Sequence, residues 1–229
     1  LYMEQKETKT IMNQVYNAIF SDIIHNEFDF DEYLTEKALM EKYNVSRAPV
    51  REALMQLRSD HFIVCIPRHG YRIRRPDQQE LRDIVNFRAV LECSFLEQYY
   101  YSITPEHIQS LREICRQYAD KQDKNFINYW KLNRDFHAKL FSCYGNDFAL
   151  HTLLESMDRQ VIYFVEIMKN YYLAADLHFA MLDYIEKGDI KTAMTLLRAD
   201  IEKIPTNDAL QRVKQNHPIN AEVPTYSLC

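Results

Sequence analysis

Glycine is scarce in this chain, and its scarcity limits the folds that the sequence can adopt. Only three of the 229 residues are glycine, at positions 70, 145 and 188. Glycine supplies the left-handed backbone of tight hairpin turns and the close approach of phosphate-binding loops. A glycine-rich nucleotide loop and a fold with many hairpins are therefore excluded. The sequence predicts long helices joined by a small number of turns.

No apolar run in the sequence approaches the ~20 residues that a membrane-spanning helix needs. The N-terminal stretch LYMEQKETKT is polar and lacks the apolar core of a secretory signal. The five cysteines are widely scattered, without the close spacing of a zinc knuckle or a redox motif, and we interpret them as reduced thiols in a core. Together these features predict a cytoplasmic protein.

Charge is unevenly distributed along the chain. The formal net charge is −5, yet between Asn44 and Arg75 seven arginines stand against two acidic residues. A basic segment in an otherwise acidic protein is typical of a surface that meets the phosphate backbone of a nucleic acid.

Three helices are predicted in the N-terminal third. Apolar residues at three- and four-residue spacing from Ile11 to Ile24 indicate an amphipathic helix of about 15 residues. Thr35 is a predicted N-cap for a short second helix that ends at Asn44, and Ser46 is a predicted N-cap for a third.

The third helix reads SRAPVREALMQLRSD from Ser46. Val50 and Leu54 face the core in this pattern, while Arg47 and Arg51 lie four residues apart on another face. The first residues of a recognition helix reach base edges in the major groove, where the arginine fork suits the O6 and N7 atoms of guanine. The helix is therefore predicted to read DNA.

A basic hairpin follows this helix. The apolar run FIVCIP leads into the turn Arg68–His69–Gly70 and then into the second strand, YRIRR. A hairpin after a helix-turn-helix is a wing, whose basic tip can approach phosphate or the minor groove.

The segment closely resembles the DNA-binding domain of GntR-family regulators, whose recognition helix carries a Ser-Arg-x-Pro-Val-Arg-Glu-Ala-Leu stretch. The sequence from Ser46 to Leu54 matches every fixed position. The resemblance implies that Arg47 and Arg51 contact DNA beside Ser46, and that Ala48 occupies the variable contact position. It also implies that His69 and Gly70 form the wing tip.

The rest of the chain reads as helix. Residues 1–75 are predicted to form the winged helix-turn-helix, and residues 76–229 a helical domain that begins after Arg75-Pro76-Asp77. Six helices are expected, around Ile84–Leu91, from Pro105, over 126–144, 147–170 and 173–187, and from the Asp189 cap to about residue 203. The tail after Pro205 shows little periodicity. The predicted fold class is thus mainly α, with an antiparallel helical bundle after the winged domain.

The bundle resembles the FCD effector domain of the FadR subgroup within the same family. Three segments carry the likeness: FRAVLE from Phe87, NRDFHAKL from Asn133 and HFAMLDYIEKGD from His178. In that domain one Asp and three His usually bind a metal ion. The resemblance places these ligands at Asn133, His137, His178 and Asp200, so two positions depart from the pattern.

The departures exchange one carboxylate for another, because Asn133 replaces the first Asp and Asp200 replaces the last His. Two imidazoles and one carboxylate still suit a divalent ion such as zinc, nickel or manganese. The alternative is a polar pocket that binds its effector without metal. Arg88, by the resemblance, pairs with an anionic effector, and Asn133, His137 and His178 line the same pocket. Alternatively, Arg88 forms a structural ion pair with Glu92 one turn later.

These features predict a homodimeric bacterial transcriptional regulator, not an enzyme, that binds operator DNA under control of a small carboxylate effector. A homodimer is expected because symmetric operators have two half-sites. Two alternatives stay open. One is a metal-free acyl-ligand sensor of the same architecture, and the other is an enzyme with a facial triad of two histidines and a carboxylate.

Overall fold

The computed structural model describes residues 10–75, 78–119, 126–167 and 176–203. The backbone divides into two compact units, one reaching residue 76 and the other spanning residues 77–204. We describe each unit by itself. The domain boundary expected at residues 75 and 76 adjoins residues 76–77, which lie outside the described ranges, as do the tail after Pro205 and residues 168–175.

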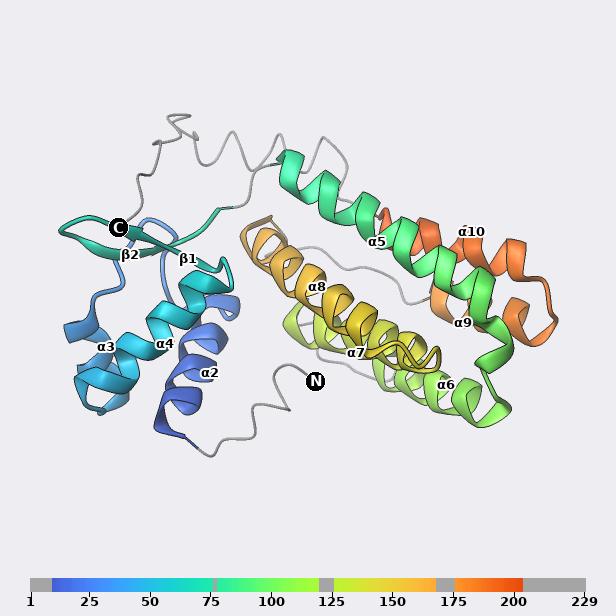
Figure 1. The fold of residues 1–229 in the computed structure, drawn as a ribbon, viewed down its shortest axis with the longest axis horizontal. Helices are drawn as coiled ribbons and strands as arrows, with labels where there is room; N and C mark the ends of the chain where they lie inside the picture. The colour runs from blue at the N-terminus through green and yellow to red at the C-terminus, as the bar shows by residue number, and fades with distance from the viewer. Residues whose placement is uncertain (1–9, 76–77, 120–125, 168–175, 204–229) are drawn as a thin grey trace. The chain divides into compact units, whose positions relative to one another are not determined.

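The described residues of the N-terminal unit form three helices and a two-stranded antiparallel sheet (Figure 1). In chain order they are α2 (Ile11–Ile24), α3 (Glu36–Tyr43), α4 (Arg47–Ser59), β1 (Ile63–Ile66) and β2 (Gly70–Ile73). Helix α4 packs against α2, α3 and β1. Its apolar face supplies much of the core, since Val50, Leu54 and Leu57 have no exposed surface. This is the predicted winged helix-turn-helix.

Local signals explain most helix ends in this unit. The Thr35 hydroxyl accepts a hydrogen bond of 3.2 Å from the Ala38 amide, as expected of an N-cap. Asn44 ends α3 in the left-handed conformation, with φ of 51°. Ser46 does stand at the N-cap of α4, but its side chain makes no capping hydrogen bond. The predicted N-cap position of Ser46 is therefore confirmed, but its hydroxyl does not supply the capping hydrogen bond.

The turn of the wing lies one residue earlier than the sequence suggested. Ile66 pairs with Gly70 in the β-ladder, so the turn comprises residues 67–69 and Gly70 already belongs to β2. Gly70 has φ of 113°, and a Cβ atom there would lie 2.7 Å from the carbonyl oxygen of Leu34. Glycine is needed because β2 passes directly against the backbone before α3. Two backbone hydrogen bonds join Leu34 and Tyr71 at this crossing.

In the C-terminal unit, the residues that the structure describes form a closed ring of six α-helices. They are α5 (Gln78–Tyr99), α6 (Pro105–Ala119), α7 (Phe126–Ser142), α8 (Asp147–Ile167), α9 (Asp176–Glu186) and α10 (Ile190–Ile201), with a short 3₁₀ turn, η1 (Tyr100–Ser102), after α5. Each helix packs on two others, in the order α5, α8, α7, α6, α9, α10 and back to α5. Figure 1 shows α7 beside α8 and α5 beside α10. Side chains that point inward from these helices therefore converge.

The helix ends of this unit follow the sequence signals. Asp189 accepts a hydrogen bond from the Thr192 amide at 3.1 Å and caps α10. Gly145 and Gly188 have positive φ angles after α7 and α9, as expected for residues that end helices. The prediction of a mainly α fold, with a winged unit and a helical bundle, is confirmed. Among the described residues, none of the helices is both long and apolar enough to cross a membrane.

Candidate functional site

The start of α4 presents its polar side chains outward. Ser46, Arg47, Ala48 and Arg51 are all exposed, and the Arg47 side chain retains 74% of its accessible surface. Because Val50 on the same helix is fully buried, the core fixes which face of α4 remains free. The guanidinium groups of Arg47 and Arg51 thus lie on the exposed first turns of this helix, where the sequence predicted them.

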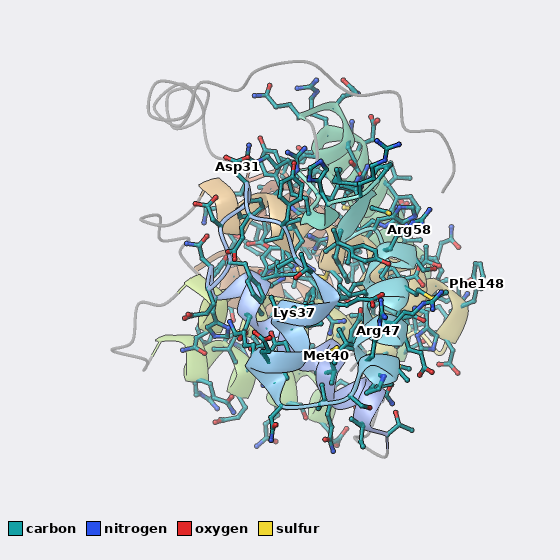
Figure 2. All side chains as sticks on the ribbon, turned by 90° about the vertical axis from the view of Figure 1, so that its left-hand side faces the viewer. Asp31, Lys37, Met40, Arg47, Arg58 and Phe148 are labelled. Carbon is teal, nitrogen blue, oxygen red and sulfur yellow. The ribbon has the colours of Figure 1, made fainter. Side chains whose placement is uncertain are left out.

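Arg47 has an acidic partner that the sequence did not indicate. Its Nε atom lies 2.5 Å from Oε2 of Glu36, in the first turn of α3. In Figure 2, Lys37, Met40 and Arg47 are seen on the same side of the N-terminal unit. The second helix therefore contributes to the surface that surrounds Arg47.

The wing tip is exposed but anchored. His69 is exposed, and its ring stacks on Tyr33 with centroids 5.0 Å apart and an interplanar angle of 23°. Gly70 is half-buried, because it meets the backbone of Leu34. Gly70 thus has a packing role that explains its presence without any DNA contact.

Inside the helical unit, three predicted ligands converge. Candidate ligand atoms of His137, His178 and Asp200 all lie within 4.8 Å of one another. Oδ2 of Asp200 is 3.0 Å from Nε2 of His178 and 3.2 Å from Nε2 of His137. The side chains come from α7, α9 and α10 and are nearly inaccessible to solvent. Two imidazole nitrogens and a carboxylate oxygen form a donor set for a divalent ion.

Both histidines are held in place by further contacts. Nδ1 of His137 lies 2.5 Å from Oε2 of Glu92, so the carboxylate accepts from the ring and leaves Nε2 facing Asp200. The His178 ring stacks on Phe136 at a centroid distance of 3.9 Å. These supports direct one nitrogen of each ring toward the shared Asp200 oxygen. The three donors fit a resident metal ion.

Glu92 also links the histidine to a buried arginine. Nε of Arg88 donates to Oε1 of Glu92 at 3.0 Å, and Nη1 donates to Oε1 of Gln160 at 2.6 Å. The structural ion pair proposed as the alternative for Arg88 is therefore present. Nη2 of Arg88 lies 2.9 Å from Glu92 Oε1, yet this buried nitrogen makes no hydrogen bond within the described part of the chain. One donor group of Arg88 stays available.

The charges in this cluster shift the pKa values of its members. Burial raises the pKa of Glu92, but the charges of His137 and Arg88 outweigh it and the pKa is lowered. Burial likewise opposes ionisation of Asp200, and the charge of His178 together with hydrogen bonds from both histidines lowers its pKa well below the usual value. Burial lowers the pKa of His137, whereas Glu92 and Asp200 raise it, and the net shift is upward. Glu92 and Asp200 are both carboxylates at neutral pH.

Asn133, the fourth predicted ligand, occupies the border of two small cavities. It is 8% exposed, and no hydrogen bond of its amide is found among the described residues. One cavity, of about 10 Å³, is bounded by Asn133, His178, Phe136 and Cys115. The other, of about 20 Å³, is bounded by Asn133, Arg88, Gln160, Asp200 and Lys203. Each has room for on the order of one water molecule.

The sequence thus indicated five of the interior residues, namely Arg88, Asn133, His137, His178 and Asp200. Three others were missed. Glu92 was recognised only as an ion-pair partner of Arg88, and Gln160 and Lys203 carried no local signal. The contact from Arg88 to Gln160 spans 72 positions, so only the closed helix ring brings them together.

Comparison with known proteins agrees with both halves of this description. The model of the bacterial regulatory proteins of the gntR family matches residues 11–73, and that of the FCD domain matches residues 83–203, more than half of the chain. Two similar curated proteins are the HTH-type transcriptional repressors GlaR and RspR of Escherichia coli K12. They are 29% and 26% identical over 63% and 58% of this chain, and the aligned regions span 66% and 59% of their own lengths.

Solved structures support the fold. The structure of E. coli McbR/YncC matches with a TM-score of 0.69 and 18% identity, covering 90% of this chain and 98% of that one. A putative GntR transcriptional regulator from Rhodococcus sp. RHA1 matches with a TM-score of 0.68 and 17% identity, covering 89% and 97%. Together with the two family matches, these findings show that the chain belongs to the GntR family of bacterial regulatory proteins and carries an FCD domain.

Proposed function

We propose that this protein is a DNA-binding transcriptional regulator whose operator affinity is controlled by a small anionic effector bound inside the helical unit. The observation that carries the proposal is the composition of the inner cavity. Arg88, whose Nη2 makes no hydrogen bond among the described residues, lines the same cavity as Asn133 and as Asp200 of the histidine cluster. Carboxylates are the ligands that an arginine fork recognises best.

The DNA-binding part of the proposal rests on Arg47 and Arg51. Both are exposed on the first turns of α4, supported by a fully buried face of the same helix. We expect each arginine to contact a base or a phosphate, with Ser46, Ala48 and the wing residues His69 and Gly70 close to the DNA.

The test uses DNA selected from a random library by the wild-type protein. Arg47→Ala and Arg51→Ala should each weaken binding to the selected sequence by roughly 1–3 kcal/mol, with unchanged thermal unfolding. Glu41→Gln, at an exposed position on α3, serves as a control for changed surface charge. Unchanged binding by both arginine variants would overturn the assignment of α4 as the recognition helix.

A divalent metal ion is part of the proposed effector site. His137, His178 and Asp200 would hold it, with Asn133 as a weaker fourth ligand, and the bound ion would attract an effector carboxylate through its charge. Arg88 and Gln160 would orient that carboxylate from the other side of the cavity. Elemental analysis of the purified protein, followed by titration with zinc, nickel or manganese, tests for the ion. His137→Ala and His178→Ala should lose most of the affinity.

The two classes of effector differ in how far the inner space would have to open. Cavities of about 10 and 20 Å³ hold on the order of one water molecule each, so the helices would have to separate for a small carboxylate and separate further for an acyl chain. The donor atoms of His137, His178 and Asp200 also match the two histidines and one carboxylate of a facial-triad enzyme, but both matched families are families of regulators. A thermal-shift screen of small mono- and dicarboxylic acids, with and without chelator, separates these alternatives.

We further propose that the protein acts as a homodimer. One winged unit reads a short half-site, and two copies related by a twofold axis would read a symmetric operator. Sedimentation at micromolar concentration should give twice the mass of 27.4 kDa. A monomer under these conditions would contradict the proposal.

A further inference from the structure

A residue that reads a DNA base must hold its side chain in a defined orientation, and the protein core does not do this for Arg47. Its side chain is 74% exposed, so packing alone does not hold the guanidinium in one place. A free arginine side chain loses rotamer entropy when it is fixed in a complex. A guanidinium group that moves freely also binds any phosphate within reach. Something other than the core must direct Arg47 if it distinguishes one base from another.

Glu36 contacts Arg47 at the atom that leaves its recognition edge free. The carboxylate oxygen Oε2 accepts from Nε, at 2.5 Å, and not from the terminal nitrogens. The guanidinium carries five N–H groups in a fixed plane, so a contact through Nε leaves Nη1 and Nη2 for another partner. The bidentate contact with O6 and N7 of guanine can use these terminal groups.

Glu36 is itself well placed to act as a fixed support. Its side chain is only 23% exposed, far less than that of Arg47. It lies in the first turn of α3, directly after the Thr35 cap, and Leu34 just before it is joined to β2 through two backbone hydrogen bonds with Tyr71. The recognition helix therefore contacts this carboxylate directly, and the wing is joined to the backbone two residues before it.

The electrostatics of Tyr71 agree with that placement. Burial raises the pKa of Tyr71, Cys65 and Glu36 raise it further through their negative charge, and the charges of Arg58 and Arg51 lower it. Glu36 is thus the carboxylate among the charged groups that act on Tyr71, beside two arginines of the recognition helix.

We propose that Glu36 is a positioning residue that holds Arg47 ready for a base and limits its attraction to phosphate, and so raises sequence specificity. The inference rests on the proposed DNA-reading role of Arg47. Glu36 lowers the entropy cost of ordering the fork on the correct sequence. On other sequences its negative charge offsets that of Arg47, which weakens the charge-driven binding to the DNA backbone.

The experiment measures affinity for two duplexes of equal length, the sequence selected by the wild type and a scrambled one, over a range of salt concentrations. Glu36→Gln keeps the shape but removes the charge. It should weaken binding to the selected duplex by about fivefold, the upper range for an exposed ion pair. It should strengthen binding to the scrambled duplex by about twofold or more, with a steeper dependence on salt.

Two further variants separate position from charge. Glu36→Asp keeps the charge on a shorter side chain, so it should lose affinity for the selected duplex without gaining affinity for the scrambled one. Glu41→Gln removes the same charge from the exposed part of α3, where the carboxylate faces Lys37 at 4.0 Å. It should leave the ratio of the two affinities unchanged. Thermal unfolding of each variant confirms that α3 is intact.

The last comparison combines Glu36→Gln with Arg47→Ala. If Glu36 acts through Arg47, Glu36→Gln should cause no further loss of affinity for the selected duplex once Arg47 is replaced by alanine. Independent and additive losses would overturn the inference, as would a Glu36→Gln variant that behaves like Glu41→Gln. A different outcome, in which Arg47→Ala binds the selected duplex as tightly as wild type, would refute the DNA-reading role itself.

Discussion

The inner cluster comprises Arg88, Glu92, His137, His178 and Asp200. Glu92 is its most informative member to replace, because it contacts both Arg88, the proposed effector contact, and His137, a proposed metal ligand. The substitution is Glu92→Gln, which keeps the shape and removes the charge. In the native protein the carboxylate accepts from Nε of Arg88 at 3.0 Å and from Nδ1 of His137 at 2.5 Å. An amide offers only one acceptor oxygen, so at least one of these contacts is lost.

Two losses of different size follow from this geometry. Glu92 and Arg88 are each 2% exposed, and removing one charge of a buried pair costs about 3 kcal/mol in the free energy of unfolding. The metal affinity should fall by about 10- to 100-fold, because His137 loses the acceptor that fixes its tautomer and its ring orientation. The second effect requires His137 to bind the ion through Nε2.

Asp158→Asn provides the matched control. Asp158 receives two hydrogen bonds from the buried Arg134, at 2.6 and 2.9 Å, in the same helical unit. Its loss should destabilise the unit to a similar extent but leave metal affinity within about twofold of wild type. The assay is titration with zinc against a chelating indicator, alongside thermal unfolding. Equal metal affinities for the two variants would refute the idea that Glu92 supports a ligand.

Three further predictions concern other parts of the chain. In thermal unfolding, Gly70→Ala should destabilise the N-terminal unit by about 2–3 kcal/mol, because φ is 113° and the new Cβ would meet the backbone oxygen of Leu34. Gly188 has φ of 74° and no atom within 4 Å of the added Cβ, so Gly188→Ala should cost only about 1 kcal/mol in the same assay. Asn133→Asp should tighten zinc binding in titrations, since an anionic oxygen replaces a neutral amide, and weaker binding would remove Asn133 from the ligand set. Zinc affinity should fall as the pH decreases through the raised pKa of His137, because the protonated ring cannot bind a metal ion. Without metal the dependence should be opposite. The folded protein holds the His137 proton more tightly than the unfolded chain does, so thermal unfolding with chelator should show a loss of stability as the pH rises through that pKa.

The sequence predicted those features that depend on short spacing. Thr35 and Asp189 stand before amphipathic runs, and both prove to be caps with side-chain hydrogen bonds. Asn133 and His137 are four residues apart, so one helical face had to carry both. Ser46 offered the same signal as Thr35, yet its hydroxyl makes no capping hydrogen bond. A residue type indicates where a helix begins, but the orientation of its side chain depends on neighbours.

Features that depend on distant contacts could not be predicted in this way. Glu92 lies 45 positions from His137, and Glu36 lies 11 from Arg47 on a different helix. Neither pairing produces a periodic pattern, because it arises only after helices pack together. The resemblance to known regulators supplied the positions of the candidate ligands, whereas the structure supplies the residues that hold those ligands in place.

The charges of the inner cluster have a consequence for how the metal ion and the effector affect each other's binding. Around the two histidines the buried charges are those of Arg88, Glu92 and Asp200, so the cluster is negative by one unit when both imidazoles are neutral. An anionic effector alone would add to this negative charge, which is costly in a buried space. A divalent ion alone would leave the cluster positive by one unit. The ion together with a monoanionic carboxylate makes it neutral, as protonation of His137 does in their absence, and each should therefore raise the affinity of the other by the same factor. The metal ion and the effector would then act on operator binding as a pair.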